Sequence, residues 1–246
     1  MKKKILTRKE FDQLRITKAN MMSKDKTLFR NSIKLIEKAD EHMFIHQNNF
    51  FGEPSINFSD DLMRFQELIY KTKPDYVIEI GVAWGGTTLF LANILEGIGK
   101  GKVIGVDIDI REHNRQALDS HPMRHMIELI EGSSIDKKIF EQVQKLSFGY
   151  NKVMVFLDSH HSHEHVLSEL KLYSNFVTKN SYCIVFDTVI EDLPSILNAN
   201  RPWGPGNSPK TAVKSFLEKD KNFQIDNTFE EKYIITVAPD GFLKRI

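Results

Sequence analysis

From Lys71 onward, the chain alternates short apolar runs with longer segments in which apolar residues recur at helical spacing. The short runs predict five strands, at residues 76–80, 102–107, 126–131, 152–157 and 181–186. The segments between and after them predict helices over residues 87–97, 111–119, 135–147 and 162–178. This alternation is typical of a parallel sheet whose strands are joined by crossover helices.

Two further apolar runs, 222–227 and 232–237, follow a helix that starts near Lys210. Their connection is short, so we expect them to pair antiparallel to each other at the end of the sheet. Residues 71–246 are therefore predicted to form an α/β, Rossmann-like domain with a mostly parallel seven-stranded sheet flanked by helices.

Residues 1–70 lie outside this alternation and are predicted to form a helical extension packed against the domain or lying over it. Helical patterns run over 26–43 and 60–71, and Ser59 or Asp60 suits the N-cap of the second helix. The first residues are locally basic and are interpreted as a solvated, partly frayed arm. Its basic residues are Lys2, Lys3, Lys4, Arg8, Lys9, Lys18, Lys24 and Lys26.

Composition narrows the class of protein. The net charge of the 246 residues is +1, whereas domains that bind nucleic acid usually carry a marked basic excess, so we expect no nucleic-acid partner. Cys183 is the only cysteine, which excludes an intrachain disulfide and favours a reducing compartment. No apolar h-region follows Met1, and no run approaches the ~20 apolar residues that span a bilayer. We expect a cytoplasmic protein without a membrane span.

The first predicted strand ends in a glycine-rich turn, Glu79-x-Gly81-x-x-x-Gly85-Gly86, which opens a helix. Glycine tolerates positive φ and lets backbone N–H groups approach a ligand, as nucleotide sites require. The spacing differs from the G-x-G-x-x-G of dinucleotide sites and resembles the first motif of S-adenosylmethionine-dependent methyltransferases. Asp107 ends the next strand, where a ribose diol would require a carboxylate. The alternative is a turn whose glycines only permit tight packing.

Two more carboxylates, Asp158 and Asp187, follow the fourth and fifth predicted strands. Ligands of open α/β sheets bind outside the carboxyl ends of the strands, so both acids are expected near the turn. Carboxylates at adjacent strand ends suit Mg²⁺, which binds one or two of them plus water and substrate oxygens. Either acid could instead cap a helix or shape a turn.

Histidines cluster after Asp158, at His160, His161, His163 and His165. Residues two apart diverge on a helix, and no H-E-x-x-H pattern is present, which argues against a dedicated zinc site. A single histidine acting as general base fits better, because the ordinary imidazole pKa near 6.5 allows it to accept a proton at neutral pH. His161 is the first choice and His160 the second.

Longer motifs resemble the cephalosporin hydroxylase/rhamnosyl O-methyltransferase family. They are the runs beginning Gly105-Val-Asp107, Glu131-Gly132-Ser133, Asp158-Ser-His-His, Glu169-Leu-Lys-Leu-Tyr173 and Arg201-Pro-Trp-Gly-Pro-Gly, with further similarity upstream through Asp61, Gln66-Glu67 and Lys73-Pro-Asp75. The resemblance implies a class I methyltransferase fold, a divalent metal and a homo-oligomer. It places S-adenosylmethionine on Glu79, Gly81, Gly85, Gly86, Asp107 and Ser133, and the metal on Asp158 and Asp187.

The chain departs from this family at one position. Members that carry the pair Glu-Asp after the fifth strand have two carboxylates there, whereas this chain has Phe186 before Asp187. We therefore expect fewer protein ligands around the metal ion, with water or substrate completing its coordination shell. Trp203 lies in a loop rich in proline and glycine, and could wall a substrate pocket, form a subunit contact or belong to a rigid surface connection.

Taken with the resemblance, the sequence indicates an S-adenosylmethionine-dependent O-methyltransferase, assisted by Mg²⁺, that acts on a hydroxyl of a sugar or small natural product. Asp158, His161 and Asp187 are the expected catalytic residues. Two alternatives stay open at this point. An NAD-dependent oxidoreductase or epimerase is disfavoured by the glycine spacing and because Val177, not lysine, follows Tyr173 by four residues. A non-catalytic S-adenosylmethionine-binding protein is kept open by Phe186.

Overall fold

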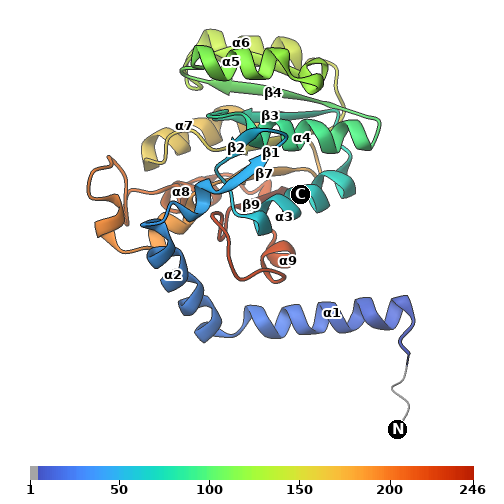
Figure 1. Cartoon of the computed structure of the whole chain (residues 1–246), viewed down its shortest axis with the longest axis vertical. Coiled ribbons are helices and arrows are strands. Elements are labelled where there is room, and N and C mark those ends of the chain that lie inside the picture. Colours follow the sequence, from blue (N-terminus) through green and yellow to red (C-terminus); the bar gives the residue numbers. More distant parts are fainter. Residues whose placement is uncertain (1–4) are drawn as a thin grey trace.

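The central element is a seven-stranded sheet in the order β5-β4-β3-β6-β7-β9-β8 (Figure 1). The computed structural model describes residues 5–246, apart from the side chain of Glu230. The strands are β3 (Tyr76–Ile80), β4 (Lys102–Asp107), β5 (Ile127–Glu131), β6 (Val153–Leu157), β7 (Tyr182–Val185), β8 (Phe223–Ile225) and β9 (Phe242–Arg245). Strands β3 to β7 pair parallel, which confirms the predicted α/β class and mostly parallel sheet.

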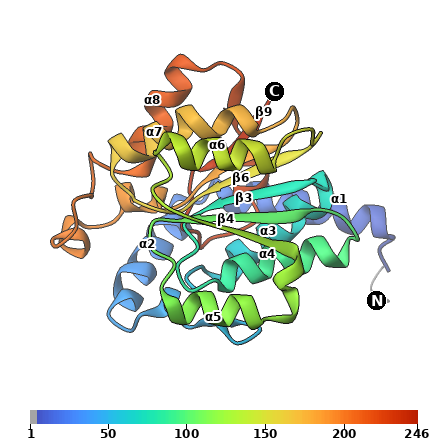
Figure 2. The ribbon, with the colours of Figure 1, turned by 90° about the horizontal axis from the view of Figure 1, so that it is seen from above.

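Helices cover both faces of the sheet, as Figure 2 shows. One face carries α3 (Ser59–Thr72), α4 (Gly86–Gly97) and α5 (Glu112–Ser120), and the other carries α6 (Lys137–Leu146), α7 (His163–Tyr173) and α8 (Pro209–Lys219). Successive side chains of a strand point to opposite faces. Val77 and Met154 therefore join the core under the first helices, while Ile78 and Val155 join the core under the second.

The prediction of a strand at 232–237 was wrong. This run is irregular, and the last strand is β9, which pairs antiparallel with both β7 and β8. The run is held instead by Asp61 on α3, whose carboxylate accepts hydrogen bonds from the Thr236 hydroxyl (2.7 Å) and the Val237 N–H (2.9 Å). A short helix, α9 (Asn227–Glu230), follows β8. An antiparallel pair does form at this edge of the sheet, but it joins β8 to β9 and has a longer connection than expected.

The N-terminal segment contains more regular structure than the sequence suggested. The helices α1 (Arg8–Ser23) and α2 (Lys26–Asp40) are followed by a 3₁₀ turn, η1 (Phe44–His46), and a hairpin of β1 (Asn48–Phe50) and β2 (Glu53–Ser55). The expected frayed arm is thus largely helical, and Thr7 and Glu10 cap α1 reciprocally. Lys2, Lys3 and Lys4 lie outside the described residues. In Figure 1, α1 projects away from the sheet, and none of its residues is buried.

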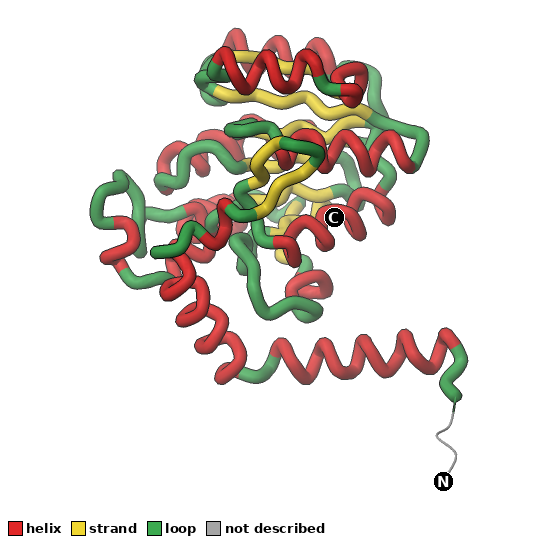
Figure 3. Tube along the Cα trace, in the orientation of Figure 1, coloured by secondary structure: helices red, strands yellow, loops and turns green. Residues whose placement is uncertain are grey.

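One local prediction for this segment was wrong, and one element was missed. The N-cap of α3 is Phe58, without a side-chain cap, in place of Ser59 or Asp60. The hairpin was not predicted because its strands are only three residues long (yellow in Figure 3). Its turn is closed by Asn49, whose carbonyl Oδ1 accepts the Gly52 N–H at 2.9 Å. Across residues 5–246, no helix has both the length and the apolar character needed to cross a bilayer.

Candidate active site

The glycine-rich turn is shaped by contacts within the chain itself. Gly81 has φ +102°, and a Cβ there would lie 1.9 Å from the backbone oxygen of Asp158. A Cβ on Gly86 would lie 2.3 Å from the oxygen of Pro54 in β2, and one on Gly85 would lie 2.8 Å from a methyl carbon of Leu118. Tight packing therefore explains all three glycines, as the alternative interpretation proposed. It does not exclude a ligand, because Gly81 also lines two cavities.

Asp107 fixes the conformation of the turn. Its Oδ2 accepts the N–H groups of Val82 and Ala83, both at 2.9 Å, and its Oδ1 accepts that of Asp109 at 3.1 Å. Asn114 on α5 donates from Nδ2 to the oxygen of Ala83 at 2.8 Å. The end of β4 and the turn after β3 thus form one rigid unit. Each carboxylate oxygen can accept more than one hydrogen bond, so Asp107 keeps capacity for a hydroxyl donor.

An inner cavity of about 240 Å³ opens beside this unit. Three of the residues expected to bind the cofactor, Gly81, Asp107 and Ser133, lie on its wall with Asp158. Three others, Glu79, Gly85 and Gly86, do not line it. The structure therefore divides the expected set into residues that border the cavity and residues that support its wall.

Glu79 is a supporting residue. It is only 2% exposed, and its Oε2 accepts a hydrogen bond of 2.5 Å from the Thr88 hydroxyl on α4. The pKa of this carboxyl is raised to about 8, mainly by burial; the Thr88 hydrogen bond lowers it in part and the nearby Asp107 carboxylate raises it. Glu79 joins β3 to α4 beneath the turn.

Asp158, His161 and Asp187 come together at the carboxyl ends of β6 and β7. One ligand atom from each lies within 4.8 Å of the others, and His161 Nε2 is 3.1 Å from Asp187 Oδ2. All three side chains are half-buried. Asp187 has φ 55°, a left-handed conformation that aspartate tolerates better than most residues. The three residues expected to be catalytic thus form one cluster.

Charge repulsion within the cluster favours a cation. Burial raises the pKa of Asp158 well above its usual range, and the Asp187 carboxylate raises it further. A divalent ion or an ammonium group between two such carboxylates would remove the repulsion and favour their ionised forms. Two carboxylates and an imidazole are an acceptable donor set for such an ion, with water completing the shell.

The other histidines serve different contacts. His163 donates its backbone N–H to Asn207 and pairs through Nδ1 with the Thr211 hydroxyl at 2.8 Å. His165 pairs with the buried Glu169 at 3.1 Å. His160 pairs with Ser162. The rings of His160 and His165 lie 5.0 Å apart, while His161 is the one histidine of the four in the cluster with Asp158 and Asp187.

Phe186 points into the core. Its ring is 2% exposed and lies 5.2 Å from that of Phe65 and 5.7 Å from that of Phe156, measured between centroids. The position before Asp187 therefore contributes no ligand atom to the cluster. The third residue of the cluster is His161.

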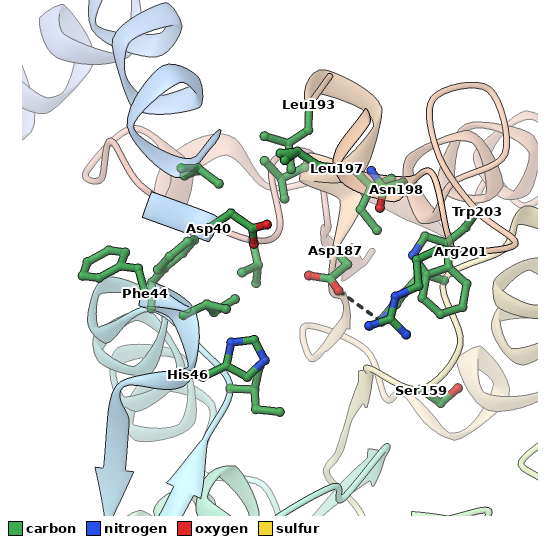
Figure 4. A pocket seen from close by; sticks show the side chains of 18 residues that line it. Asp40, Phe44, His46, Ser159, Asp187, Leu193, Leu197, Asn198, Arg201 and Trp203 are labelled. Carbon is green, nitrogen blue, oxygen red and sulfur yellow. Dashed lines mark ion pairs between the residues drawn. The ribbon is translucent and has the colours of Figure 1, made fainter. Parts of the chain in front are cut away.

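An outer cavity of about 450 Å³ adjoins the cluster and is drawn in Figure 4. It is bordered by His161 and by Asp187, which Figure 4 labels. The side chains of these two residues form the 3.1 Å pair of the cluster. Trp203 also lines it, with its ring 4.9 Å from that of His161 and nearly perpendicular to it. Of the interpretations open for this tryptophan, the wall of a pocket is the one observed. The N-terminal segment supplies the opposite side through residues of α2 and η1, including Asp40, Phe44 and His46.

A third, smaller cavity of about 190 Å³ lies between the turn and the cluster. It shares Gly81 and Asp158 with the inner cavity, and His161 and Asp187 with the outer one. Sequence reasoning missed one of its lining residues, Asn57, because no motif marks it. The only signal was its position in the stretch from Asn48 to Phe58, which had no clear periodicity.

Comparisons with known proteins agree with this arrangement. The model of the family described as rhamnosyl O-methyltransferase/CmcI matches residues 42–246. A rhamnosyl O-methyltransferase of Mycobacterium tuberculosis is 35% identical over 189 residues, which cover 75% of this chain and 73% of that protein. The Mycobacterium leprae protein of the same name is 32% identical over 199 residues, covering 80% and 82%.

Solved structures share the fold at lower identity. CmcI with Mg and SAM has a TM-score of 0.57 and 15% identity, covering 82% of this chain and 77% of that one. The O-methyltransferase of Bacillus cereus in complex with SAH has a TM-score of 0.51 and 13% identity, covering 86% and 88%. These likenesses establish the class I methyltransferase fold. The family model and the mycobacterial relatives show that the chain belongs to the rhamnosyl O-methyltransferase/CmcI family.

Proposed function

We propose that this protein transfers the methyl group of S-adenosylmethionine to a hydroxyl of a sugar or small natural product. The observation that carries the proposal is the position of Asp158, His161 and Asp187 where the three cavities meet. A cofactor in the inner cavity and an acceptor in the outer one would meet at this cluster. Family membership and the names of the mycobacterial relatives support the reaction type.

The cofactor side is assigned to Gly81, Asp107 and Ser133. Asp107 would accept hydrogen bonds from ribose hydroxyls, while Gly81 keeps side-chain atoms out of the passage toward the cluster. Bound S-adenosylmethionine supplies the electrophilic methyl group of its sulfonium. Glu79, Gly85 and Gly86 act indirectly, by fixing the turn that forms the cavity wall.

On the acceptor side, His161 is the general base. Asp187, 3.1 Å from Nε2, orients the imidazole and stabilises the imidazolium that forms when the ring takes the hydroxyl proton. The acceptor oxygen then forms its bond to the methyl carbon as the carbon–sulfur bond breaks, and the thioether leaves with that electron pair. Holding the two reactants in line supplies much of the barrier reduction.

Asp158 and Asp187 would hold a divalent cation, Mg²⁺ being the expected one. Its positive charge would lower the pKa of an acceptor hydroxyl next to it. The donor set fits such an ion, since two mutually repelling carboxylates share one half-buried site. Phe186 leaves the shell with fewer carboxylates than the Glu-Asp pair would provide.

The outer cavity suits an acceptor with both apolar and polar faces. Trp203 offers a flat aromatic surface next to His161, against which the C–H face of a sugar ring could pack. Arg201 and Asn198 supply donors, while Phe44 and Leu193 supply apolar walls. Because α2 and η1 close one side, we also propose that residues 1–70 act as an extension of the domain at 71–246 that helps select the acceptor.

Methyl transfer can be measured directly. The protein is incubated with methyl-labelled S-adenosylmethionine and a panel of glycosides and phenols, with Mg²⁺ or with EDTA. We expect label on an acceptor hydroxyl, more with Mg²⁺ than with EDTA. Calorimetry with S-adenosylhomocysteine and NAD separates the alternatives, since binding of NAD alone would indicate an oxidoreductase, and cofactor binding without transfer would indicate a non-catalytic protein.

Self-association is part of the same proposal. The exposed helix α1 carries Phe11, Leu14 and Met21 at near-helical spacing, with 52%, 44% and 59% of each residue exposed. Apolar side chains on a projecting helix suit contact with another subunit. Light scattering on the full chain and on a variant that lacks residues 1–24 tests this, and a monomeric full chain would contradict it.

A further inference from the structure

The side-chain carbonyl of Asn57 is buried without a hydrogen-bond partner. The residue is 1% exposed, and Oδ1 has no partner in the structure. Leaving such a group unpaired destabilises the folded protein, so native proteins rarely retain one without a reason. Asn57 lines the cavity of about 190 Å³ between the glycine turn and the catalytic cluster. A ligand in this cavity could supply the missing donor.

The amide of Asn57 is held in place from several sides. Its Nδ2 donates to the Thr87 hydroxyl at 3.1 Å, and Thr87 also pairs with the Ser55 hydroxyl at 2.9 Å. The backbone oxygen of Asn57 accepts a bond of 2.6 Å from Asn48 Nδ2. The hairpin of β1 and β2 is therefore tied to the first turn of α4, and Oδ1 is the atom of the Asn57 amide that has no partner.

The unpaired oxygen needs a hydrogen-bond donor. Asp158 and Asp187 both line the cavity, and none of the described residues on its wall is lysine or arginine. The N–H groups of Val82 and Ala83 are already bonded to Asp107, and that of Gly85 to the oxygen of Val82. A carboxylate group only accepts hydrogen bonds, whereas an ammonium group offers three N–H donors, so an ammonium group suits Oδ1.

The shape of the site indicates which ammonium group this is. The cavity continues from the inner one through the shared residues Gly81 and Asp158. A ligand with its nucleoside in the inner cavity would extend its amino-acid end into this one. Resting on the proposed function, we infer that Asn57 Oδ1 accepts a hydrogen bond from the α-ammonium group of S-adenosylmethionine. Asn57 is thus a cofactor-recognition residue supplied by the N-terminal segment.

The test compares two ligands by calorimetry: S-adenosylhomocysteine and an analogue in which hydrogen replaces the α-amino group. The variant Asn57→Leu keeps the size of the side chain and removes the acceptor. Because charge-assisted hydrogen bonds contribute about 1.5–3 kcal/mol, we expect S-adenosylhomocysteine to bind about 10- to 100-fold more weakly. The analogue should bind Asn57→Leu and the wild-type protein equally well, within about twofold.

Two further variants identify the cause of any loss. Asn57→Asp retains an acceptor and adds negative charge, so it should bind S-adenosylhomocysteine at least as well as the wild-type protein. Asn49→Leu removes a side-chain bond of the same hairpin but lies outside the cavity, and should bind both ligands normally. If Asn57→Leu bound both ligands equally more weakly, or if Asn57→Asp lost binding of S-adenosylhomocysteine, the inference would be overturned and the proposed function would stand. Failure of the wild-type protein to bind S-adenosylhomocysteine would overturn the proposed function as well.

Discussion

Gly81 and Asp158 meet so closely that a Cβ on the glycine would lie 1.9 Å from the aspartate's backbone oxygen. This contact joins the end of β3 to the end of β6, and so links the cofactor turn to the catalytic cluster. Gly81→Ala should destabilise the protein by roughly 3–5 kcal/mol, because it combines a backbone clash with positive φ. Urea unfolding measures the loss.

Gly52 provides a matched control for that substitution. Its φ of +103° is nearly that of Gly81, at +102°, but no atom lies within 4 Å of a Cβ placed there. Gly52→Ala should therefore cost only the conformational strain, about 1–2 kcal/mol. Equal losses in the two variants would show that the contact with Asp158 does not determine the choice of glycine at position 81.

His161→Gln should lower the rate of methyl transfer by roughly 10²- to 10⁴-fold, because the acceptor hydroxyl loses its general base. Binding of S-adenosylhomocysteine should change much less, since His161 does not line the inner cavity proposed for the nucleoside and borders only the cavity proposed for the amino-acid end. His163→Gln is the control, because His163 bonds to Thr211 and Asn207 away from the cluster. Steady-state rates near the wild-type value in His161→Gln would exclude His161 as the general base.

Phe186→Glu tests why the chain lacks a second carboxylate before Asp187. The ring packs against Phe65 and Phe156, so the substitution would bury an acid in an aromatic core. We expect a loss of about 4 kcal/mol or more in the free energy of unfolding and no gain in Mg²⁺ affinity. Phe186→Leu should lose less of the free energy of unfolding, because its side chain stays apolar. A stable Phe186→Glu protein that binds Mg²⁺ more tightly would show that the side chain can reach the cluster.

Glu79 should make stability depend on pH. Burial raises its pKa from 4.5 to about 8 in the folded protein, so between these values the folded state holds a proton that the unfolded state has released. Its contribution to stability therefore falls as pH rises from about 5 to 8, by roughly 2–3 kcal/mol. Glu79→Gln keeps an acceptor for Thr88 and removes the titration. Urea unfolding at pH 5 and pH 8 should show a smaller decrease for Glu79→Gln than for wild type, and identical decreases would contradict this assignment.

The sequence predicted the parallel part of the fold because each strand there is a continuous apolar run followed by a helical pattern. It placed the last strand at 232–237, whereas the strand is β9, because Asp61 holds Thr236 and Val237 outside the sheet and no local pattern reports that contact. The hairpin near Asn57 was missed because strands of three residues leave no measurable period.

The site was predictable to the extent that its residues follow strands. Asp158, His161 and Asp187 end neighbouring parallel strands, so topology alone brings them to one edge. The glycines were assigned to the cofactor, and the structure adds a second reason for two of them, because a Cβ on Gly85 would crowd Leu118 and one on Gly86 would clash with the backbone of Pro54. Contacts of that kind join segments far apart in the sequence, and no local pattern reports them.

The most direct test of the central claim is a comparison of Asp158→Asn with the wild-type protein at saturating methyl-labelled S-adenosylmethionine, in the presence of Mg²⁺ and an acceptor. Single-turnover transfer and S-adenosylhomocysteine affinity are measured on the same samples. If the cluster performs the chemistry, transfer should fall by about 10²-fold or more while the affinity changes by less than about tenfold. Transfer at the wild-type rate, or an equal loss of transfer and affinity, would contradict the account.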